Sequence, residues 1–586
     1  MRSTFSGLNT MVRGVFANQL SLDTVGHNIT NASTEGYSRQ SVNQAATKAQ
    51  EVPSLYGGAL VGTGVDAMSI MRARNVYADK QFWAETSTHE YYKAEQVNYD
   101  KLEAIFDDSD NTGIKDAMDA FYAAWSALSK DASADSSRVT VIEKGNIFAD
   151  KMNTVASQLQ DQINAQYDDM RIHLAEVNDI NDQIVELNKN ISGAEAVGAQ
   201  ANDLRDQRDL LVDKLSAYMN VNIYEDDKGM YTVVSNGISM VNGINKLTLE
   251  MSDPYVNTDY GINDYSIIIK ESGVAFIPQN GELKAEFDTI AEDKEYIDNL
   301  ADMAAFMMTT FNTMHQQGAG IDGTDGDINI GPIYNTTNYT GPTYGINFFG
   351  DNNTVYTWDA NNHCVVATEY TDATINRYLS KPNAITDTPV VYIDGTVVST
   401  GPVNLKGINI LNEMRINSKL TEVGGTSLVA ARRLVVEEDV DSNGAYQNTF
   451  SVKANGSKDG TNAVNMSTLF NLAADNVTTT ADVSYNGTVV NMNSRSINDI
   501  SLNAYYQSVM SQLGTDANSV DIKESAQDDL ITQIVNWRSS TSGVDWNEEL
   551  TNMIMFQKGY SACSRCLTTM DEMLDRLINS TGTVGR

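Results

Sequence analysis

Residues 146–192 read NIFADKMNTVASQLQDQINAQYDDMRIHLAEVNDINDQIVELNKNIS, a stretch that contains neither proline nor glycine. Its apolar residues recur at steps of three and four from Met152 to Ile191. That spacing places them on one face of an α-helix, and a helix of this length spans roughly 70 Å. The stretch therefore predicts one long amphipathic helix within a helical frame.

The positions of proline extend this prediction to the rest of the chain. The eight prolines leave two proline-free zones, 54–253 and 403–586. Because proline interrupts helix interiors, both zones can hold long helices. Helices are also predicted over residues 75–106, 114–128, 202–218, 286–314 and 521–537.

Two regions between the helices have a strand-like pattern. Residues 220–284 contain short β-branched runs separated by Asn236-Gly237 and Asn242-Gly243, pairs that suit tight hairpin turns. In the second region, about 330–455, Asp394-Gly395 is predicted to turn a hairpin. The order helix, strands, helix, strands, helix predicts a multidomain α+β fold with β-rich insertions. The two chain ends must then be neighbours if the helical frame is one body.

These patterns predict how the chain divides into domains. The expected parts are a terminal helical assembly domain (1–40 and 546–586), a long-helix bundle domain (41–220, 285–320 and 456–545), an inserted β domain (221–284) and a second β-rich insertion (321–455).

Both chain ends carry an apolar stripe at alternating three- and four-residue spacing, as in coiled coils. Such a stripe needs a partner that buries it, and isolated helices of this length are marginal in water. Two interpretations stay open, because both need the same stripe: the ends form an intramolecular helical hairpin in an ordinary core, or they pair and also pack on other copies. The N-terminal stripe is Phe5, Leu8, Val12, Val15, Gln19, Leu22, Gly26 and Ile29, and the C-terminal stripe is Met553, Phe556, Tyr560, Cys563, Leu567, Met570, Leu574 and Leu577.

A specific turn follows the N-terminal stripe in HNITNASTEGYSRQ, residues 27–40. Asn28 and Asn31 can end a helix, since Asn tolerates the left-handed C-cap conformation. Gly36 then supplies a turn that a side chain would hinder, and Tyr37 is an anchor with an apolar body and a polar tip. The chain beyond Tyr37 is expected to run extended and to fold the terminal helix back, although a plain helix-stop turn is the simpler alternative.

Composition excludes several kinds of partner. The 586 residues include 40 Lys and Arg and 77 Asp and Glu, a formal net charge of −37. Nucleic acid and anionic membrane surfaces are therefore poor partners, because both attract basic proteins. Three cysteines make no disulfide framework. The sequence shows no cleavable signal peptide and no apolar run long enough to span a bilayer.

Candidate chemical sites are weak. CSRC, residues 563–566, lacks the βαβ context of redox pairs and the four ligands of structural zinc. The acidic loop IDGTDGDIN, residues 321–329, has Asp322, Asp325 and Asp327 at spacings unlike a calcium-binding EF-hand. The five histidines are scattered. We therefore expect no catalytic residue, no metal and no cofactor.

Several stretches resemble the bacterial flagellar axial proteins, the family of rod, hook and hook-associated proteins. LDTVGHNITNASTEGYSRQ is similar to their N-terminal motif. Within that family the match narrows to the hook-associated proteins. The stretches that carry it are GTGVDAMSIMRARNVYADKQF (62–82), LADMAAFMMTTFNTMHQQGAGIDG (300–323), SINDISLNAYYQSVMSQLG (496–514) and SGVDWNEELTNMIMFQKGYSACSRCLTTMDEMLDRLIN (542–579). Asn75 and Cys566 depart from the family pattern but lie outside the stripes.

This resemblance implies a structural subunit at the junction between flagellar hook and filament, without enzymatic activity. It implies type III export, secretion to the flagellum and assembly through the terminal stripes together with Asn31, Gly36 and Tyr37. The implied partners are other copies of the chain, the hook protein, the next hook-associated protein and an export chaperone on the C-terminal helix. The alternatives are another axial protein (hook or rod), or a junction protein with a ligand- or metal-binding insertion at 330–455.

Overall fold

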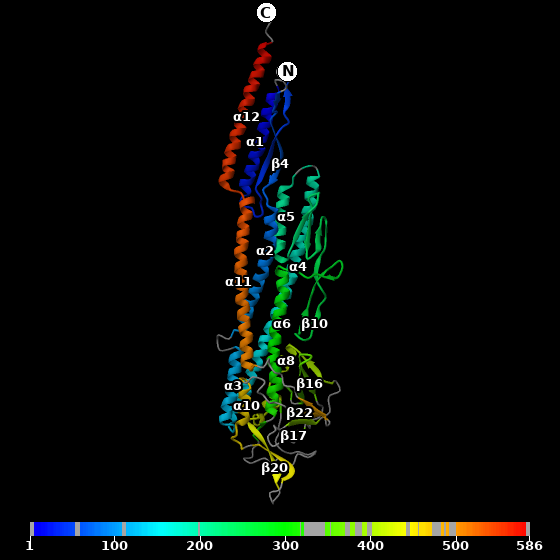
Figure 1. Cartoon of the computed structure of the whole chain (residues 1–586), viewed down its shortest axis with the longest axis vertical. Coiled ribbons are helices and arrows are strands. Elements are labelled where there is room, and N and C mark those ends of the chain that lie inside the picture. The colour runs from blue at the N-terminus through cyan, green and yellow to red at the C-terminus, as the bar shows by residue number, and fades with distance from the viewer. Residues whose placement is uncertain are drawn as a thin grey trace.

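The computed structural model is a long rod with both chain ends at the same end (Figure 1). Helices run along the rod, and most strands lie on its flank or at its far end. The structure describes residues 5–52, 59–107, 113–196, 198, 200–316, 318–321, 346–351, 353–369, 376–380, 390–394, 401–440, 446–454, 456–471, 482–485, 488–491 and 500–581. The longer helices are α1 (Phe5–Asn31), α2 (Val76–Ile105), α3 (Ile114–Lys130), α4 (Asp135–Glu195), α5 (Asn202–Tyr218), α6 (Glu282–Phe306), α11 (Leu502–Ser542) and α12 (Trp546–Thr581).

Helix α4 is the longest element of the shaft, with 61 residues. It confirms the predicted helix over 146–192 and extends it at both ends. The extension passes through Gly145, where an added methyl group would lie 2.8 Å from Phe348 and 3.1 Å from Phe121. A glycine usually weakens a helix interior. This one is explained by close packing, because there is no room for a side chain.

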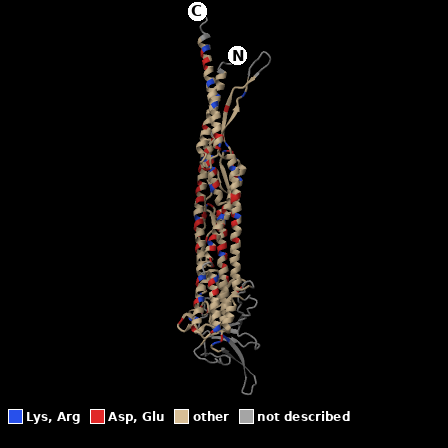
Figure 2. Ribbon diagram, turned by 90° about the vertical axis from the view of Figure 1, so that its left-hand side faces the viewer, with Lys and Arg blue, Asp and Glu red and all other residues tan. Residues whose placement is uncertain are grey.

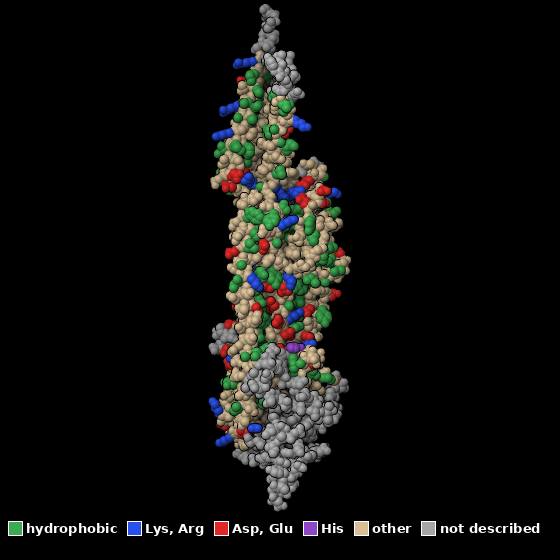
Figure 3. Space-filling view, in the orientation of Figure 1, with side chains coloured by type: hydrophobic (Ala, Val, Ile, Leu, Met, Phe, Trp, Pro, Cys, Tyr) green, Lys and Arg blue, Asp and Glu red, His purple; other side chains and the backbone are tan. Residues whose placement is uncertain are grey.

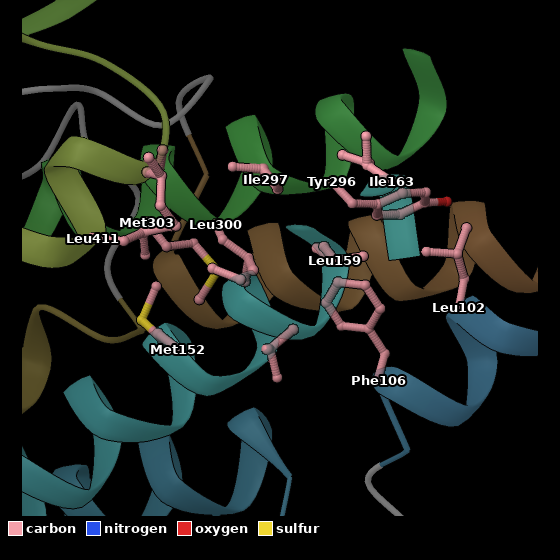
Figure 4. Close-up of a cluster of buried hydrophobic side chains, with 14 of the residues drawn as sticks. Leu102, Phe106, Met152, Leu159, Ile163, Tyr296, Ile297, Leu300, Met303 and Leu411 are labelled. Carbon is pink, nitrogen blue, oxygen red and sulfur yellow. The ribbon is translucent and has the colours of Figure 1, made fainter. Parts of the chain in front are cut away.

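The hydrophobic core of the shaft follows the apolar face of α4. Side chains of α2, α4, α6 and α8 (Ile408–Glu413) meet there, as Figure 4 shows for Phe106, Leu159 and Leu300 among others. These three residues are buried. Burial of this kind contributes roughly 1.5–3 kcal/mol for each large apolar side chain. The core thus makes the shaft a single packed body.

The other predicted helices agree with the structure to different degrees. Those over 75–106, 114–128 and 202–218 are confirmed by α2, α3 and α5. The prediction over 521–537 is too short, since α11 has 41 residues. The prediction over 286–314 covers most of α6, a π-helical turn (Met307–Phe311) and part of α7 (Asn312–Gln316).

Two hairpin regions lie near the shaft. An antiparallel pair, β1 and β4, runs beside α1, with the β2–β3 pair between them in sequence. Residues 222–275 form a four-stranded sheet, a three-stranded sheet and a two-stranded pair. The predicted Asn236-Gly237 turn is confirmed by positive φ angles of 48° and 74°. The strands are β1 (Gln40–Ala46), β2 (Gln50–Val52), β3 (Ala59–Val61), β4 (Val65–Arg72), β5 (Asn222–Glu225), β6 (Tyr231–Ser235), β7 (Ile238–Asn242), β8 (Asn245–Lys246), β9 (Leu249–Met251), β10 (Tyr255–Asn257), β11 (Ile262–Asp264), β12 (Ile267–Ile269) and β13 (Val274–Ala275).

The end of the rod far from the termini combines short strands with short helices. The second predicted strand of the Asp394-Gly395 hairpin lies outside the described residues, and so do Asp322, Asp325 and Asp327. The helical elements there are α9 (Ser418–Thr421), a 3-10 turn (Gly425–Leu428) and α10 (Thr461–Thr468). The strands are β14 (Gly318–Ala319), β15 (Thr354–Asp359), β16 (Cys364–Glu369), β17 (Asn376–Ser380), β18 (Val390–Asp394), β19 (Val403–Leu405), β20 (Arg432–Val440), β21 (Tyr446–Ala454), β22 (Asp482–Tyr485) and β23 (Thr488–Asn491).

Acidic residues are distributed along the whole shaft (Figure 2). The net charge of −37 is therefore not confined to one tail or loop. Like charges spread in this way favour solubility and oppose non-specific association between copies.

Candidate functional site

The two terminal helices lie side by side and antiparallel at one end of the rod (Figure 1). An added methyl group at Gly7 would lie 2.9 Å from Met570, and one at Gly14 would lie 3.0 Å from Cys563. Farther along, Asn28 donates to Glu549 over 3.1 Å. Each step forward on α1 is matched by an equal step back on α12, so the pair has one continuous register. The two ends are neighbours, as the sequence predicted.

The residues of α1 whose contacts with α12 are described lie beside the predicted N-terminal stripe. The residues of α1 that meet α12 include Gly7, Gly14 and Asn28. The stripe residues Leu8, Val15 and Ile29 each follow one of these contact residues by one position, which is about 100° of rotation around the helix. Phe5 begins α1, and its side chain lies outside the described residues. The other apolar stripe residues are all partly exposed: Leu8, Val12, Val15, Leu22 and Ile29.

The predicted C-terminal stripe does face α1, because Met570 and Cys563 belong to it. Even so, none of its described members is fully buried, and Tyr560 is 39% exposed. The side chain of Leu577 is not among those described. The remaining members are partly exposed: Met553, Phe556, Leu567, Met570 and Leu574.

The terminal pair has no hydrophobic core of its own among the described residues. Its buried apolar residues are Ala17 and Val25, whereas the core cluster of the shaft extends from Trp83 to Val520 in sequence. Figure 3 shows hydrophobic side chains at the surface of the terminal pair. Large exposed apolar residues of α12 are Trp546, Leu550, Ile554, Met555, Tyr560, Met573 and Ile578. Exposed apolar surface on this scale is typical of an interaction site.

The turn after α1 has the shape that the sequence predicted, but for a different reason. Helix α1 ends at Asn31. Gly36 adopts φ +76°, and a methyl group added to it would lie 3.0 Å from Leu210. The prediction that Asn28 and Asn31 adopt the left-handed conformation is wrong. Outside glycine, the described residues with that conformation are Asn236 and His363. Asn28 lies inside the helix, and its role is carried by its side chain.

The role of Asn28 differs from the predicted one, because its side chain joins three segments of the chain. Its Nδ2 donates to the Gln40 carbonyl and its Oδ1 accepts the Gln40 N–H, each over 2.9 Å. Oδ1 also accepts from the hydroxyl of Tyr37 over 2.8 Å, and Nδ2 reaches buried Glu549. A polar side chain within a helix, on the face that turns inward, is the one signal that could have identified it.

Tyr37 joins the turn back to α1. Its hydroxyl lies 2.9 Å from His27 Nδ1, besides donating to Asn28. Burial and the negative charges of Asp203 and Asp206 raise its pKa. The phenol therefore stays protonated and can keep donating its hydrogen bond.

A network of ion pairs connects the end of β4 and the segment after it to α5. Arg72 Nη1 lies 2.6 Å from Asp206 and 2.9 Å from Asp209. Arg74 pairs with Asp79 over 2.8 Å and with Asp209 over 3.2 Å. Burial raises the pKa of Asp209, but the charges of Arg74 and Arg72 outweigh it, so the net pKa is lowered. The carboxylate is therefore ionised at neutral pH.

Arg538 continues this network to α11. Its guanidinium donates to Asp79 over 2.8 Å and to Asp213 over 2.6 Å, and stacks 4.4 Å from the ring centre of Phe82. Burial raises the pKa of Asp213 in spite of Arg538. We call the set Arg72, Arg74, Asp79, Asp206, Asp209, Asp213 and Arg538 the joint network. It connects α2, α5 and α11 where the terminal pair begins.

A second polar cluster lies inside the shaft beside a cavity of about 180 Å³. His173 Nδ1 lies 2.7 Å from Glu286, and burial raises the pKa of Glu286 to about 7. Nearby, Asp293 accepts from Asn98 over 3.0 Å and from Gln166 over 3.1 Å. Burial raises the pKa of Asp293 to about 7.

The described residues contain no group of three or more His, Cys, Asp or Glu placed to hold a metal ion. Cys563 faces α1, Cys566 is exposed and Cys364 is buried in the far end. Among the helices that the structure describes, none is long and apolar enough to cross a membrane.

Two known families match parts of the chain. Residues 99–328 match the family described as "Flagellar hook-associated protein FlgK helical domain". Residues 538–580 match "Flagellar basal body rod FlgEFG protein C-terminal". The first match covers the shaft from α2 to beyond α7, and the second covers α12.

Full-length relatives and one solved structure are also similar to the chain. Flagellar hook-associated protein 1 of Bacillus subtilis is 24% identical, with all of each chain covered. The protein of the same name from Salmonella typhimurium is also 24% identical, over 98% of this chain and 99% of that one. The flagellar hook junction protein FlgK from Burkholderia pseudomallei has the same fold. It has a TM-score of 0.55 and 16% identity, and the match covers 79% of this chain and 100% of that structure.

Proposed function

We propose that the chain belongs to the family of flagellar hook-associated protein 1 and that it is a structural subunit at the junction between the hook and the filament of a bacterial flagellum. It acts by binding and carries out no reaction. The observation that carries the proposal is the terminal pair, which brings both chain ends together and leaves their apolar side chains partly exposed.

The exposed terminal pair suits assembly because its apolar surface lacks cover within the described chain. Burying such surface contributes roughly 25 cal/mol for each Å² removed from water. A preformed tip that supplies the missing neighbours therefore stabilises the paired helices by mass action. We propose that the terminal helices pack in coiled-coil fashion with those of neighbouring subunits. The assembly residues are the two stripes with Asn31, Gly36 and Tyr37.

The same geometry supports a separate role for each part of the subunit. In this proposal the terminal pair forms the inner layer of a tube, the shaft is a rigid spacer, and the β-rich regions face outward. The joint network fixes the orientation of the shaft relative to the terminal pair. The subunit contacts other copies, the hook protein below it and the next hook-associated protein above it.

Export is the remaining part of the proposal. The subunit leaves the cell through the flagellar type III system, with a chaperone covering the C-terminal helix. The register places Phe5 level with Glu572, so α12 continues past the described start of α1. Met573 and Ile578 are exposed on that overhang. A chaperone that binds an apolar helix face would cover them.

The test is removal of α12 by ending the chain at Asp545. We expect the truncated subunit to keep the thermal unfolding of the shaft, because α12 lies outside the shaft's core cluster. It should fail to add to purified hooks, as judged by electron microscopy of the hook ends. A truncated subunit that still joins hook to filament would refute the assignment of assembly to the terminal pair.

A hook or rod protein is the competing identity. The 61-residue helix α4 and the match of residues 99–328 to a hook-associated helical domain favour the junction protein.

A further inference from the structure

The seam between α1 and α12 is asymmetric. On α1 it is formed at glycines, where added methyl groups would crowd the opposite helix: Gly7 against Met570 and Gly14 against Cys563. On α12 it is formed mainly by larger side chains, with one reversal at Gly559, where an added methyl group would lie 2.5 Å from Asn18. Small residues on one helix accept large residues of the other, which lets the backbones approach closely.

This seam fixes the rotation of α1 about its own axis. Gly7, Gly14 and Asn28 recur at multiples of seven residues, so they form one line along the helix. The β1–β4 region contacts α1 at positions off this line: Thr10 donates to the Thr63 carbonyl over 3.4 Å, and Arg13 pairs with Asp66 over 2.9 Å. Helix α12 and the β1–β4 region therefore cover two sides of α1. The apolar stripe, whose residues follow the seam residues by one position, remains partly exposed.

We propose that Gly7, Gly14 and Gly559 are positioning residues for assembly: they set the register of α1 on α12 and thereby turn the apolar stripe of α1 away from its own partner helix. The role in assembly rests on the proposed function, but the register does not. The stripe is thus kept for contacts between subunits instead of being used within one subunit. Asn28, which holds Glu549 at the other end of the seam, anchors the same register.

The register is tested by disulfide formation with the native Cys563. In a full-length chain that carries Cys566→Ser, Gly14→Cys is compared with the matched variant Val15→Cys, which belongs to the stripe. The β-carbon built at Gly14 lies 3.9 Å from that of Cys563, which is within the range of natural disulfides. Mild oxidation with glutathione disulfide is followed by non-reducing electrophoresis and by mass spectrometry of the linked peptides.

We expect Gly14→Cys to link and Val15→Cys to link at least about tenfold more slowly, as a 100° rotation of the β-carbon away from Cys563 implies. Equal rates, a faster Val15→Cys variant, or no linkage in either variant would each overturn the proposed register. These results are obtained on the isolated chain and do not depend on whether it joins hook to filament.

The positioning role is tested by exchanging volume across the seam. Gly14→Leu places a large side chain against Cys563, and overpacking of this kind should lower the rate of addition to hook ends by about tenfold. The double variant Gly14→Leu with Cys563→Gly should restore addition, which a loss of folding elsewhere would not allow. Normal addition by Gly14→Leu, or no rescue by the double variant, would overturn the role. If the unchanged chain itself fails to add, the proposed function fails while the linkage result stands.

Discussion

The side-chain amide of Asn28 binds both backbone polar groups of Gln40, each over 2.9 Å. This pair of hydrogen bonds ties the end of α1 to the first residue of β1, twelve positions later. Because Asn28 also donates to buried Glu549, one side chain joins the N-terminal helix, the hairpin and α12. The terminal pair is therefore held mainly at its base, where it meets the shaft.

Replacing Asn28 by alanine should loosen this base. The N–H and carbonyl of Gln40 and the carboxylate of Glu549 would lose a partner, and each unsatisfied buried group costs about 1–3 kcal/mol. We expect a local destabilisation of about 2–4 kcal/mol, measured as lost hydrogen-exchange protection of the Gln40 amide. The control is Asn31→Ala, because the hydrogen bonds of Asn31 are exposed. Equal loss of protection in both variants would contradict the special role of Asn28.

Arg538 is expected to be the most sensitive residue of the joint network. Its removal leaves Asp79 and Asp213 without their shared cation, and breaking a buried pair on one side costs about 3–5 kcal/mol. Arg538→Ala should therefore lower the urea midpoint of unfolding. Arg415→Ala, whose ion pair with Asp351 is exposed, should change stability by less than about 1 kcal/mol. A similar midpoint for both variants would show that the network contributes little.

Asp293 should make the shaft less stable as pH rises. Its pKa is about 7 in the fold because it is buried, against about 3.9 in an unfolded chain. Between those two values the folded state binds more protons, so the free energy of unfolding falls as pH increases. The loss from this group is up to about 4 kcal/mol between roughly pH 4 and pH 7.

Asp293→Asn is the variant that isolates this effect. The amide cannot ionise, so denaturant unfolding at a series of pH values should show a shallower decline than in the unchanged chain. Glu286 and Glu292, whose burial also raises the pKa to about 7, keep part of the decline. Asp168→Asn, at an exposed position, is the control. A decline of the same depth in Asp293→Asn would show that Asp293 is already ionised in the fold.

Two glycines within long helices should respond in opposite directions to alanine. At Gly145 the added methyl group would meet Phe348, Ile416 and Phe121 within 3.1 Å, and overpacking costs about 1–3 kcal/mol. At Gly514 in α11 it meets nothing within 4 Å, so the gain in helix propensity of about 1 kcal/mol remains. Urea midpoints should therefore fall for Gly145→Ala and rise for Gly514→Ala. A rise in both urea midpoints would mean that the core around Gly145 can rearrange to make room for the methyl group.

The same residues show which features could be predicted from the sequence. The long helices could be predicted, because three- and four-residue periodicity is local and runs unbroken from Met152 to Ile191. The start of α4 could not, since Gly145 reads as an interruption until the rings that pack on it are known. The seam was missed because its glycines carry no hydrophobic signal, whereas the neighbouring stripe does. The side-chain role of Asn28 was missed because its partner Gln40 is brought to it only by the turn at Gly36.

The exposed apolar face of α12 gives the last prediction. Ile554 is 54% exposed on the terminal pair and Ile244 is 60% exposed on the flanking sheet, so they are matched in type and exposure. Serine at either position should leave the unfolding of the isolated chain within about 0.5 kcal/mol, because surface substitutions rarely do more. Ile554→Ser alone should slow addition to hook ends, since it removes apolar surface that a neighbouring subunit would bury. The comparison is made by counting extended hooks in electron micrographs at equal subunit concentration. An equal slowing by Ile244→Ser would move the subunit contacts to the flanking sheet, and unchanged addition by both variants would leave the face around Ile554 outside the interface.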